Sequence, residues 1–206
     1  AQFTFPSSNW DSAQTVTLTG VNDNLIDVDT QTTITISVDA DSDSNFTSLD
    51  AQTVTVTTTD NDTAGFTITE SGGGTSVSEA GTTDTFTVVL DAQPNSDVVL
   101  SVVSADTGEV TVSPSSLTFT NANWNTAQTV TVTGVDDNII DGSQTVTITI
   151  SVVDGSSDNN FDSVDDQTVS VTITDNDTAG FTITESGGST SVSEAGTTDT
   201  FTVVLD

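Results

Sequence analysis

The sequence predicts an all-β protein made of tandem antiparallel β-sandwich repeats, each about 115 residues long. Three observations support this prediction: a long internal repeat, apolar residues that alternate with Thr, and turn residues at regular intervals. Helix formers are scarce, because the 206 residues include no Lys, Arg or Met. Val, Ile, Thr and Phe, which favour strands, dominate the rest.

The repeat is visible by comparing the chain with itself. The stretch Ala13–Asp27 (AQTVTLTGVNDNLID) recurs as Ala127–Asp141 (AQTVTVTGVDDNIID), and residues 59–73 recur at 174–188. The offset changes from 114 to 115 through one extra residue in an acidic loop before Phe161. Surface loops tolerate such insertions. A unit of this length is a domain rather than a solenoid repeat, so we expect a row of separately folded domains.

The repeat length suggests where the domains begin and end. We place a complete repeat at residues 63–177, the C-terminal part of the preceding repeat at 1–62 and the N-terminal part of the next at 178–206. The joint, DNDTAGF, has no Pro and no Gly/Ser tract. Flexible linkers need such tracts, so neighbouring repeats should pack tightly.

Period-two alternation predicts the strands of the complete repeat, with Thr facing outward and Val or Ile facing inward. Trp124 and the Phe residues are interpreted as core or sheet-edge packing. The expected strands are Gly65–Thr69 with Thr75–Ser78 as a broken first strand, Thr85–Leu90, Val98–Val103, Glu109–Ser113, Leu117–Thr120, Gln128–Gly134, Gln144–Val153 and Gln167–Thr174.

The charge balance excludes several functions. The chain has 31 acidic residues and no Lys, Arg or His, so its formal net charge is −31. Nucleic acid and anionic membranes are therefore not expected partners. No apolar run is long enough to span a bilayer. Without His, Cys, Lys or Tyr the chain lacks the usual bases and nucleophiles, and no aromatic platform accompanies a carboxylate pair as in a glycosidase. We expect no enzyme.

The acids gather at strand ends and in loops, in three recurring clusters. The end of the last strand and a hairpin between long strands can share one pole of a sandwich, which would offer the oxygen ligands that calcium prefers. Zinc and copper favour His or Cys, which are absent. The clusters are SEAG, with Glu79 and Glu194; GVDDNIID, with Asp136, Asp137 and Asp141, matched by Asn22, Asp23 and Asp27; and TDND, with Asp175, Asn176 and Asp177, matched by Asp60, Asn61 and Asp62.

The order SEAG, LTF, VDDNIIDG, VTITDND resembles the Calx-beta domain, a calcium-binding sandwich of sodium–calcium exchangers and bacterial surface proteins. The resemblance implies a seven-stranded immunoglobulin-like sandwich with calcium at one end. Asn176 and Gln144 stand where the family often has acids, so we expect one or two ions rather than several. By position, the implied ligands are Glu79, Glu109, Asp136, Asp137, the carbonyl of Ile139, Asp141, Asp175, Asn176 and Asp177.

These observations together predict an extracellular, calcium-stiffened stalk or filament with calcium at the joint between repeats. Neighbouring repeats are the expected partners. Alternatives are an adhesin or glycan-binding module at a cell surface or in a biofilm matrix, and a filament of chains that exchange strands. Acidic adaptation to salt is a further interpretation of the composition. Scattered acids are interpreted as turn and solubility residues, namely Asp39, Asp41, Asp43 and Asp158. Sequons for glycosylation occur at Asn45, Asn61 and Asn176.

Overall fold

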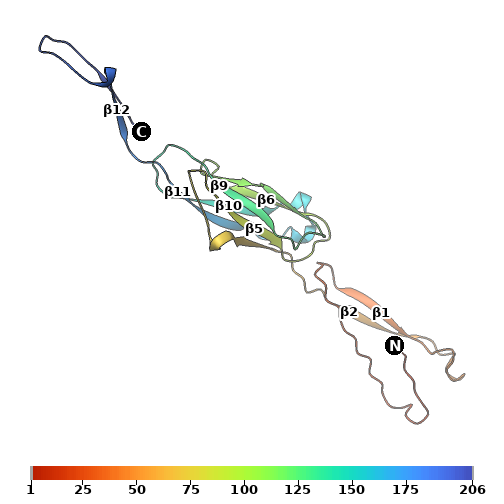
Figure 1. The fold of residues 1–206 in the computed structure, drawn as a ribbon. Helices are drawn as coiled ribbons and strands as arrows, with labels where there is room; N and C mark the ends of the chain where they lie inside the picture. Colours follow the sequence, from red (N-terminus) through yellow and green to blue (C-terminus); the bar gives the residue numbers. More distant parts are fainter. Residues whose placement is uncertain (1, 206) are drawn as a thin grey trace. The chain divides into compact units, whose positions relative to one another are not determined.

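A computed structural model describes residues 2–205 of the chain. The fold separates into two compact units, Ala1–Asp62 and Thr63–Asp206 (Figure 1). Residues 66–174 of the second unit form a two-sheet sandwich, followed by a separate hairpin. Among the described residues the only helical elements are four three-residue 3₁₀ turns, so the fold is all-β as predicted.

The sandwich has an immunoglobulin-like layout of two sheets. One sheet has the strand order β4-β11-β10-β6-β8 and the other β3-β5-β9-β7. All pairings are antiparallel except that of β4 with β11. The strands are β3 Phe66–Glu70, β4 Thr75–Ser78, β5 Thr83–Leu90, β6 Val98–Ser104, β7 Val110–Ser113, β8 Ser116–Phe119, β9 Gln128–Gly134, β10 Gln144–Val152 and β11 Gln167–Thr174.

The strand count differs from the seven that the family resemblance implies, and the broken first strand contributes to the difference. β3 pairs with β5 in one sheet, whereas β4 pairs with β11 in the other. Between them the 3₁₀ turn Ser71–Gly73 carries Gly72 and Gly73 at φ +67° and +86°. Only glycine adopts such φ values without strain, so the SGGG sequence lets the chain change sheets.

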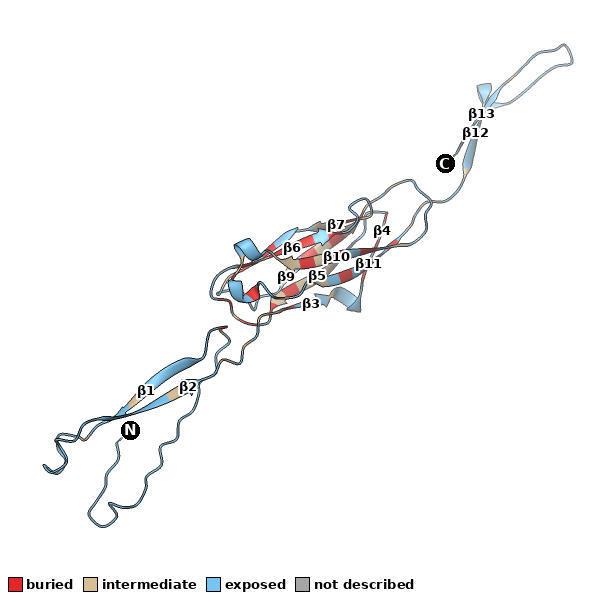
Figure 2. Ribbon diagram, turned by 180° about the vertical axis from the view of Figure 1, so that it is seen from behind, coloured by how far each residue is buried: buried red, intermediate tan, exposed pale blue. Residues whose placement is uncertain are grey.

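The core lies between the two sheets, where alternate residues point inward. Phe66, Phe86, Phe119 and Phe161 are fully or almost fully buried, with Ile148 beside them in β10. Figure 2 shows the buried positions concentrated in these strands. Thr residues mostly occupy the alternate positions, as the period-two pattern predicted. Trp124 is half-buried, and its carbonyl accepts the N–H of Leu90 at 3.1 Å.

The remaining strands form two isolated hairpins. In the first unit β1 (Thr30–Ile36) pairs with β2 (Gln52–Thr58), and at the other end of the chain β12 (Phe181–Glu185) pairs with β13 (Phe201–Leu205). Phe46, Phe181 and Phe201 of these segments are exposed, unlike the core Phe residues of the complete repeat. Their counterparts in the complete repeat, Phe161, Phe66 and Phe86, are buried between two sheets, whereas each of these segments forms a single two-stranded sheet.

Asp158 was interpreted from the sequence as a turn and solubility residue, but the structure gives it a different role. Its side chain is buried and accepts the backbone N–H groups of Asn95, Ser96 and Asn160 at 2.6–3.0 Å. These three donors satisfy the buried carboxyl oxygens without a counter-ion. Asp158 therefore joins the loop before β6 to the loop before β11.

No helix in the part of the chain that the structure describes is long and apolar enough to cross a membrane.

Candidate metal centre

Strand pairing brings two of the three acidic motifs of the complete repeat to the same edge. β4 and β11 run parallel, with Ser78 opposite Thr174, so Glu79 and Asp175 both follow directly from the paired strands. The N–H of Glu79 donates to the carbonyl of Thr174 at 3.2 Å. Single carboxylate oxygens of Glu79, Asp175 and Asp177 all lie within 4.8 Å of one another. This spacing suits a shared cation.

The GVDDNIID motif reaches the same end of the sandwich through β9 and β10. β10 begins opposite the end of β11, so the N–H of Gly142 donates to Asp175 at 2.8 Å. Asp136 lies on the other flank, where its carboxylate accepts the side-chain amide of Asn176 at 3.0 Å. Asn176 thus acts as a donor toward Asp136, while its N–H donates to Glu79 at 3.3 Å.

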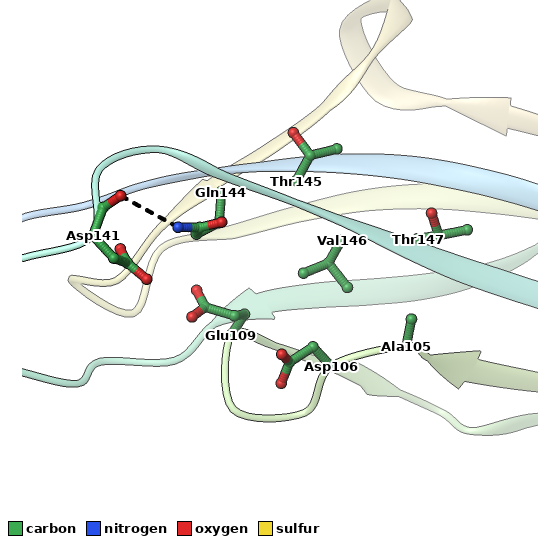
Figure 3. A pocket seen from close by; sticks show the side chains of 8 residues that line it. All are labelled: Ala105, Asp106, Glu109, Asp141, Gln144, Thr145, Val146 and Thr147. Carbon is green, nitrogen blue, oxygen red and sulfur yellow. Dashed lines mark hydrogen bonds between the residues drawn. The ribbon is translucent and has the colours of Figure 1, made fainter. Parts of the chain in front are cut away.

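Glu109 lies at this end because β7 and β9 are paired there. Its carbonyl accepts the N–H of Val135, directly after the Val110–Gly134 pair. The side chain borders an open pocket of about 390 Å³, together with Asp106, Asp141 and Gln144. Figure 3 shows the side chain of Glu109 directed toward Asp141. Gln144, at a position where the family often has an acid, donates to the carbonyl of Asp141 at 3.3 Å.

Two carboxylate oxygens of this region are buried and have no hydrogen-bond partner: Oε2 of Glu109 and Oδ2 of Asp177. Glu79 is itself almost completely buried, at 1% exposure. Buried polar atoms in native proteins are nearly always paired, and buried charges are paired or coordinate metals. The sequence holds no basic side chain, so the partner of these oxygens has to come from outside the chain's own cations: a proton, a water molecule or a metal ion.

The pKa values of these buried carboxyl groups shift in opposite directions. Burial first, and then the neighbouring carboxylates, raise the pKa values of Glu79, Glu109 and Asp177. Asp175 differs, because the N–H groups of Asp177 and Gly142 hold its pKa below the usual value. Asp175 is thus the carboxylate best held as an anion, with neighbours that bind protons more readily.

The other predicted ligands occupy different surroundings. Asp137 accepts the N–H of Ile139 at 2.6 Å, and Ile139 is an exposed residue. Asp137 and Asp141 still act on the cluster, because their charges contribute to the raised pKa values of Glu79, Glu109 and Asp177. The carbonyl of Ile139 stays a predicted ligand.

The first unit contains a partial copy of this centre. Asp23, Asp27, Asp60 and Asp62 line a pocket of about 210 Å³. Asp60 accepts the N–H groups of Asp27 and Asp62 at 3.0 and 2.9 Å. Burial and the neighbouring acids raise the pKa of Asp62. The stretch 1–62 corresponds to the later part of the repeat and does not include the positions of Glu79 and Glu109.

Glu194, in the second SEAG motif, is exposed and belongs to neither acidic group within the described residues. Sequence reasoning also missed Asp106, which borders the same pocket as Glu109 and helps to raise its pKa. Asp106 lies in the tight turn before β7 and accepts the N–H of Gly108, so its local sequence gives no sign of a site.

No protein-family model and no curated protein matches the chain. Among solved structures, it is similar to an apo-form Calx CBD1 domain, with 15% identity over 54% of this chain and 98% of that chain, and a TM-score of 0.39. Domains 4 and 5 of the S-layer protein SbsC match with 26% identity over 60% of this chain and 59% of that chain, at a TM-score of 0.35. SSP-19, a Caenorhabditis elegans protein like the MSP-domain family, matches with 15% identity over 50% and 92% of the two chains, at 0.33.

Proposed function

We propose that the chain is part of a calcium-binding, extracellular stalk or filament and carries no catalytic activity. The observation that carries the proposal is the cluster of Glu79, Asp175 and Asp177, whose oxygens converge while a buried oxygen of Asp177 has no partner. Calcium neutralises these carboxylates and supplies that partner. Carboxylates, amide oxygens and a backbone carbonyl are the ligands that calcium takes.

The position of the cluster in the sequence gives it a mechanical role. Asp177 is the last residue before the expected repeat boundary, and Asp62 holds the same place before the complete repeat. An ion bound to the final acidic triplet restrains the chain where one repeat passes into the next. Because each repeat carries the motif, calcium stiffens the array at every joint, and its removal loosens the array.

Thermal unfolding with excess calcium and with chelator tests ion binding. The Trp10→Phe background leaves Trp124 as the reporter of the complete repeat, because these are the two Trp residues of the chain. Calcium should raise the midpoint, since an ion that binds only the folded state adds about 2.7 kcal/mol at a hundredfold excess over its Kd. Equal midpoints in both conditions would contradict the proposal.

A matched pair of variants locates the site. Asp177→Asn should raise the midpoint in chelator, because one repelling charge is gone, and should reduce the gain from calcium. Asp166→Asn removes one exposed charge outside the cluster, in the loop before β11, and should keep the full calcium gain. Equal calcium gains in the two variants would place the ion elsewhere.

Stiffening has its own measurement. Small-angle scattering of the chain in calcium and in chelator should show a sharper distribution of long distances when calcium is bound. If the distance distribution stays unchanged while the melting point still depends on calcium, the chain binds the ion but the ion does not stiffen it.

A further inference from the structure

The chain enters and leaves the complete repeat at opposite ends of the sandwich. It continues on both sides of residues 63–177, so tension along the chain acts on β3, the first strand, and on β11, the last. These strands begin at the same end, where the side-chain amide of Gln167 in β11 donates to the carbonyl of Phe66 in β3. β4 runs parallel to β11, and both finish at the acidic cluster, where Glu79 and Asp175 follow them. Tension therefore draws β3 and β4 one way and β11 the other way along the same axis.

The parallel pair of β4 and β11 meets this tension in shear (Figure 2). Four residue pairs join the two strands, from Thr75–Val171 to Ser78–Thr174. The N–H of Glu79 extends the ladder by donating to the carbonyl of Thr174 at 3.2 Å. In a parallel ladder the hydrogen bonds run between the strands at even spacing, so sliding one strand past the other loads all of them at once. Pulling the same strands apart from one end breaks the bonds in turn and needs less force.

β3 and β4 are the strands that tension can detach, because each lies at the edge of its sheet. β3 pairs only with β5, and the 3₁₀ turn Ser71–Gly73 links it to β4. Once β3 slides off β5, the load passes through this turn to β4. β11 is held on its other side by seven residue pairs with β10, so it stays in the sheet when β4 leaves. Departure of β4 uncovers Val77, which is 3% exposed in the folded repeat, and opens the core.

β4 is also held by contacts outside its ladder with β11. A Cβ on Gly134 would lie 2.1 Å from the carbonyl oxygen of Ser78, so glycine allows β9 of the opposite sheet to touch the backbone of β4. The N–H of Ser78 donates to the hydroxyl of Thr82 at 2.7 Å. The N–H of Ser76 donates to the carboxylate of Asp84 at 3.0 Å. β4 cannot peel away sideways without breaking these contacts, which directs the load into the β4–β11 ladder.

The candidate metal centre spans the same pair of strands. Glu79 directly follows β4, whereas Asp175 and Asp177 come after β11, and oxygens of all three lie within 4.8 Å of one another. An ion held by all three therefore joins β4 to β11 just beyond the last ladder pair. Without an ion, the like charges repel each other across the same interface. The cluster thus strengthens or weakens the ladder according to whether a cation is bound.

We propose that the β4–β11 pair is the element of the repeat that resists tension along the chain, and that a cation bound by Glu79, Asp175 and Asp177 locks it. The lock rests on the proposed function, because it needs the ion, and a stalk is the setting in which the chain is pulled. Resistance to force then lies inside the repeat and depends on calcium separately from any stiffening at the joints. Release of β3 alone leaves the lock intact, since β3 pairs only with β5.

Single-molecule stretching of the whole chain at constant force tests the proposal. The sequence has no Cys, so one Cys added at each terminus gives two unique attachment points. Unfolding of residues 63–177 releases somewhat less than about 400 Å of chain, at about 3.5 Å per residue, which identifies the event. Calcium at a hundredfold excess over its Kd should slow this event by about a hundredfold relative to chelator, because the ion must leave before the strands part.

The direction of pulling separates the ladder from the ion. Ala80→Cys moves the first attachment to the exposed turn that follows Glu79, so that both attachments act at the end with the acidic cluster. Tension then separates β4 from β11 one pair after another instead of sliding them. In chelator and at the same force, unfolding should be faster in this direction than from terminus to terminus. Equal rates in the two directions would overturn the role of the β4–β11 pair.

A matched pair of variants examines the lock, after Trp124 fluorescence has shown that each is folded in chelator. Glu79→Gln should lose most of the slowing by calcium in terminus-to-terminus stretching. Asp166→Asn, exposed and outside the cluster, should keep it. If calcium raises the thermal midpoint but leaves the unfolding rate under force unchanged, the lock is overturned and the ion binding of the proposed function stands. If calcium changes neither quantity, the lock and the proposed ion binding both fail.

Discussion

The first part of the complete repeat and the C-terminal segment, defined as residues 178–205, carry nearly the same sequence in different environments. Gly65–Asp91 and residues 180–206 differ only at Gly74, which is Ser189 in the second copy. The hairpin register is also the same, with Phe66 opposite Leu90 and Phe181 opposite Leu205. Yet Phe66 is 2% exposed and Phe181 63%. The comparison shows that local sequence builds the hairpin, whereas burial depends on strands that are distant in the chain.

We expect the largest effect from truncating one Phe side chain in each of the two matching stretches. Phe86→Ala should destabilise the complete repeat by about 3–5 kcal/mol, because it leaves a cavity in a closed core. Phe201→Ala should leave the same transition unchanged, because Phe201 is exposed. Denaturant unfolding followed by Trp124 fluorescence in the Trp10→Phe background measures both. Equal losses would mean that the C-terminal segment shares the core of the complete repeat.

The two SEAG motifs give the next test. Glu79→Gln should remove much of the calcium gain of about 2.7 kcal/mol expected at a hundredfold excess over Kd, because the side chain is buried among other carboxylates. Glu194→Gln, in the same motif but exposed, should retain that gain. Calcium titration followed by thermal unfolding gives both values. A loss confined to the Glu194 variant would refute the assignment of the site.

Gly20 and Gly134, which end the stretches AQTVTLTG and AQTVTVTG, provide a smaller effect. Gly134→Ala should cost about 1–3 kcal/mol, because the new Cβ meets the backbone of Ser78 and strands must shift. Gly20→Ala should have little effect, since its nearest neighbour lies at ordinary contact distance. Thermal midpoints compare the pair. A tolerated Gly134→Ala would show that β4 moves freely against β9.

The pH dependence in chelator is the smallest effect that we expect. The folded state raises the pKa values of Glu79, Glu109 and Asp177, so it binds protons that the unfolded chain releases. Their contribution to stability should therefore fall as pH rises above the ordinary carboxyl values of 3.8 and 4.5. Asp175 has the opposite sign, because its pKa is lowered and its contribution is lost in acid.

Melting in chelator at several pH values above 4.5 should thus show lower midpoints toward neutral pH, and calcium should flatten this slope by replacing the protons. Glu79→Gln is the control and should itself flatten the slope in chelator. A midpoint that rises steadily toward neutral pH would show that Asp175 and the other hydrogen-bonded acids outweigh the cluster.

Much of the fold could be predicted because its signals are local. Alternation of Val and Thr predicted β4, β9 and β11 with the bounds observed, and the other strands of the complete repeat within two residues. The change of sheet between β3 and β4 was not predicted, because the sequence of a broken strand does not show whether its two halves join the same sheet or different sheets. Asp158 was misjudged for a similar reason: its three donors lie in two loops, and two of them are more than 60 residues away.

The sequence by itself determined the repeat, the inward face of each strand, and the gathering of acids at strand ends without any basic partner. These properties depend on residue type and on the period of two, which neighbouring residues set. Only the tertiary structure decided which of two identical motifs is buried and which acids lie close together. Glu79 meets Asp175 because β4 and β11 are paired, whereas Glu194 has the same neighbours in sequence and no strand beside it among residues 2–205. Burial and proximity come from pairing between distant segments, and a local pattern does not contain that pairing.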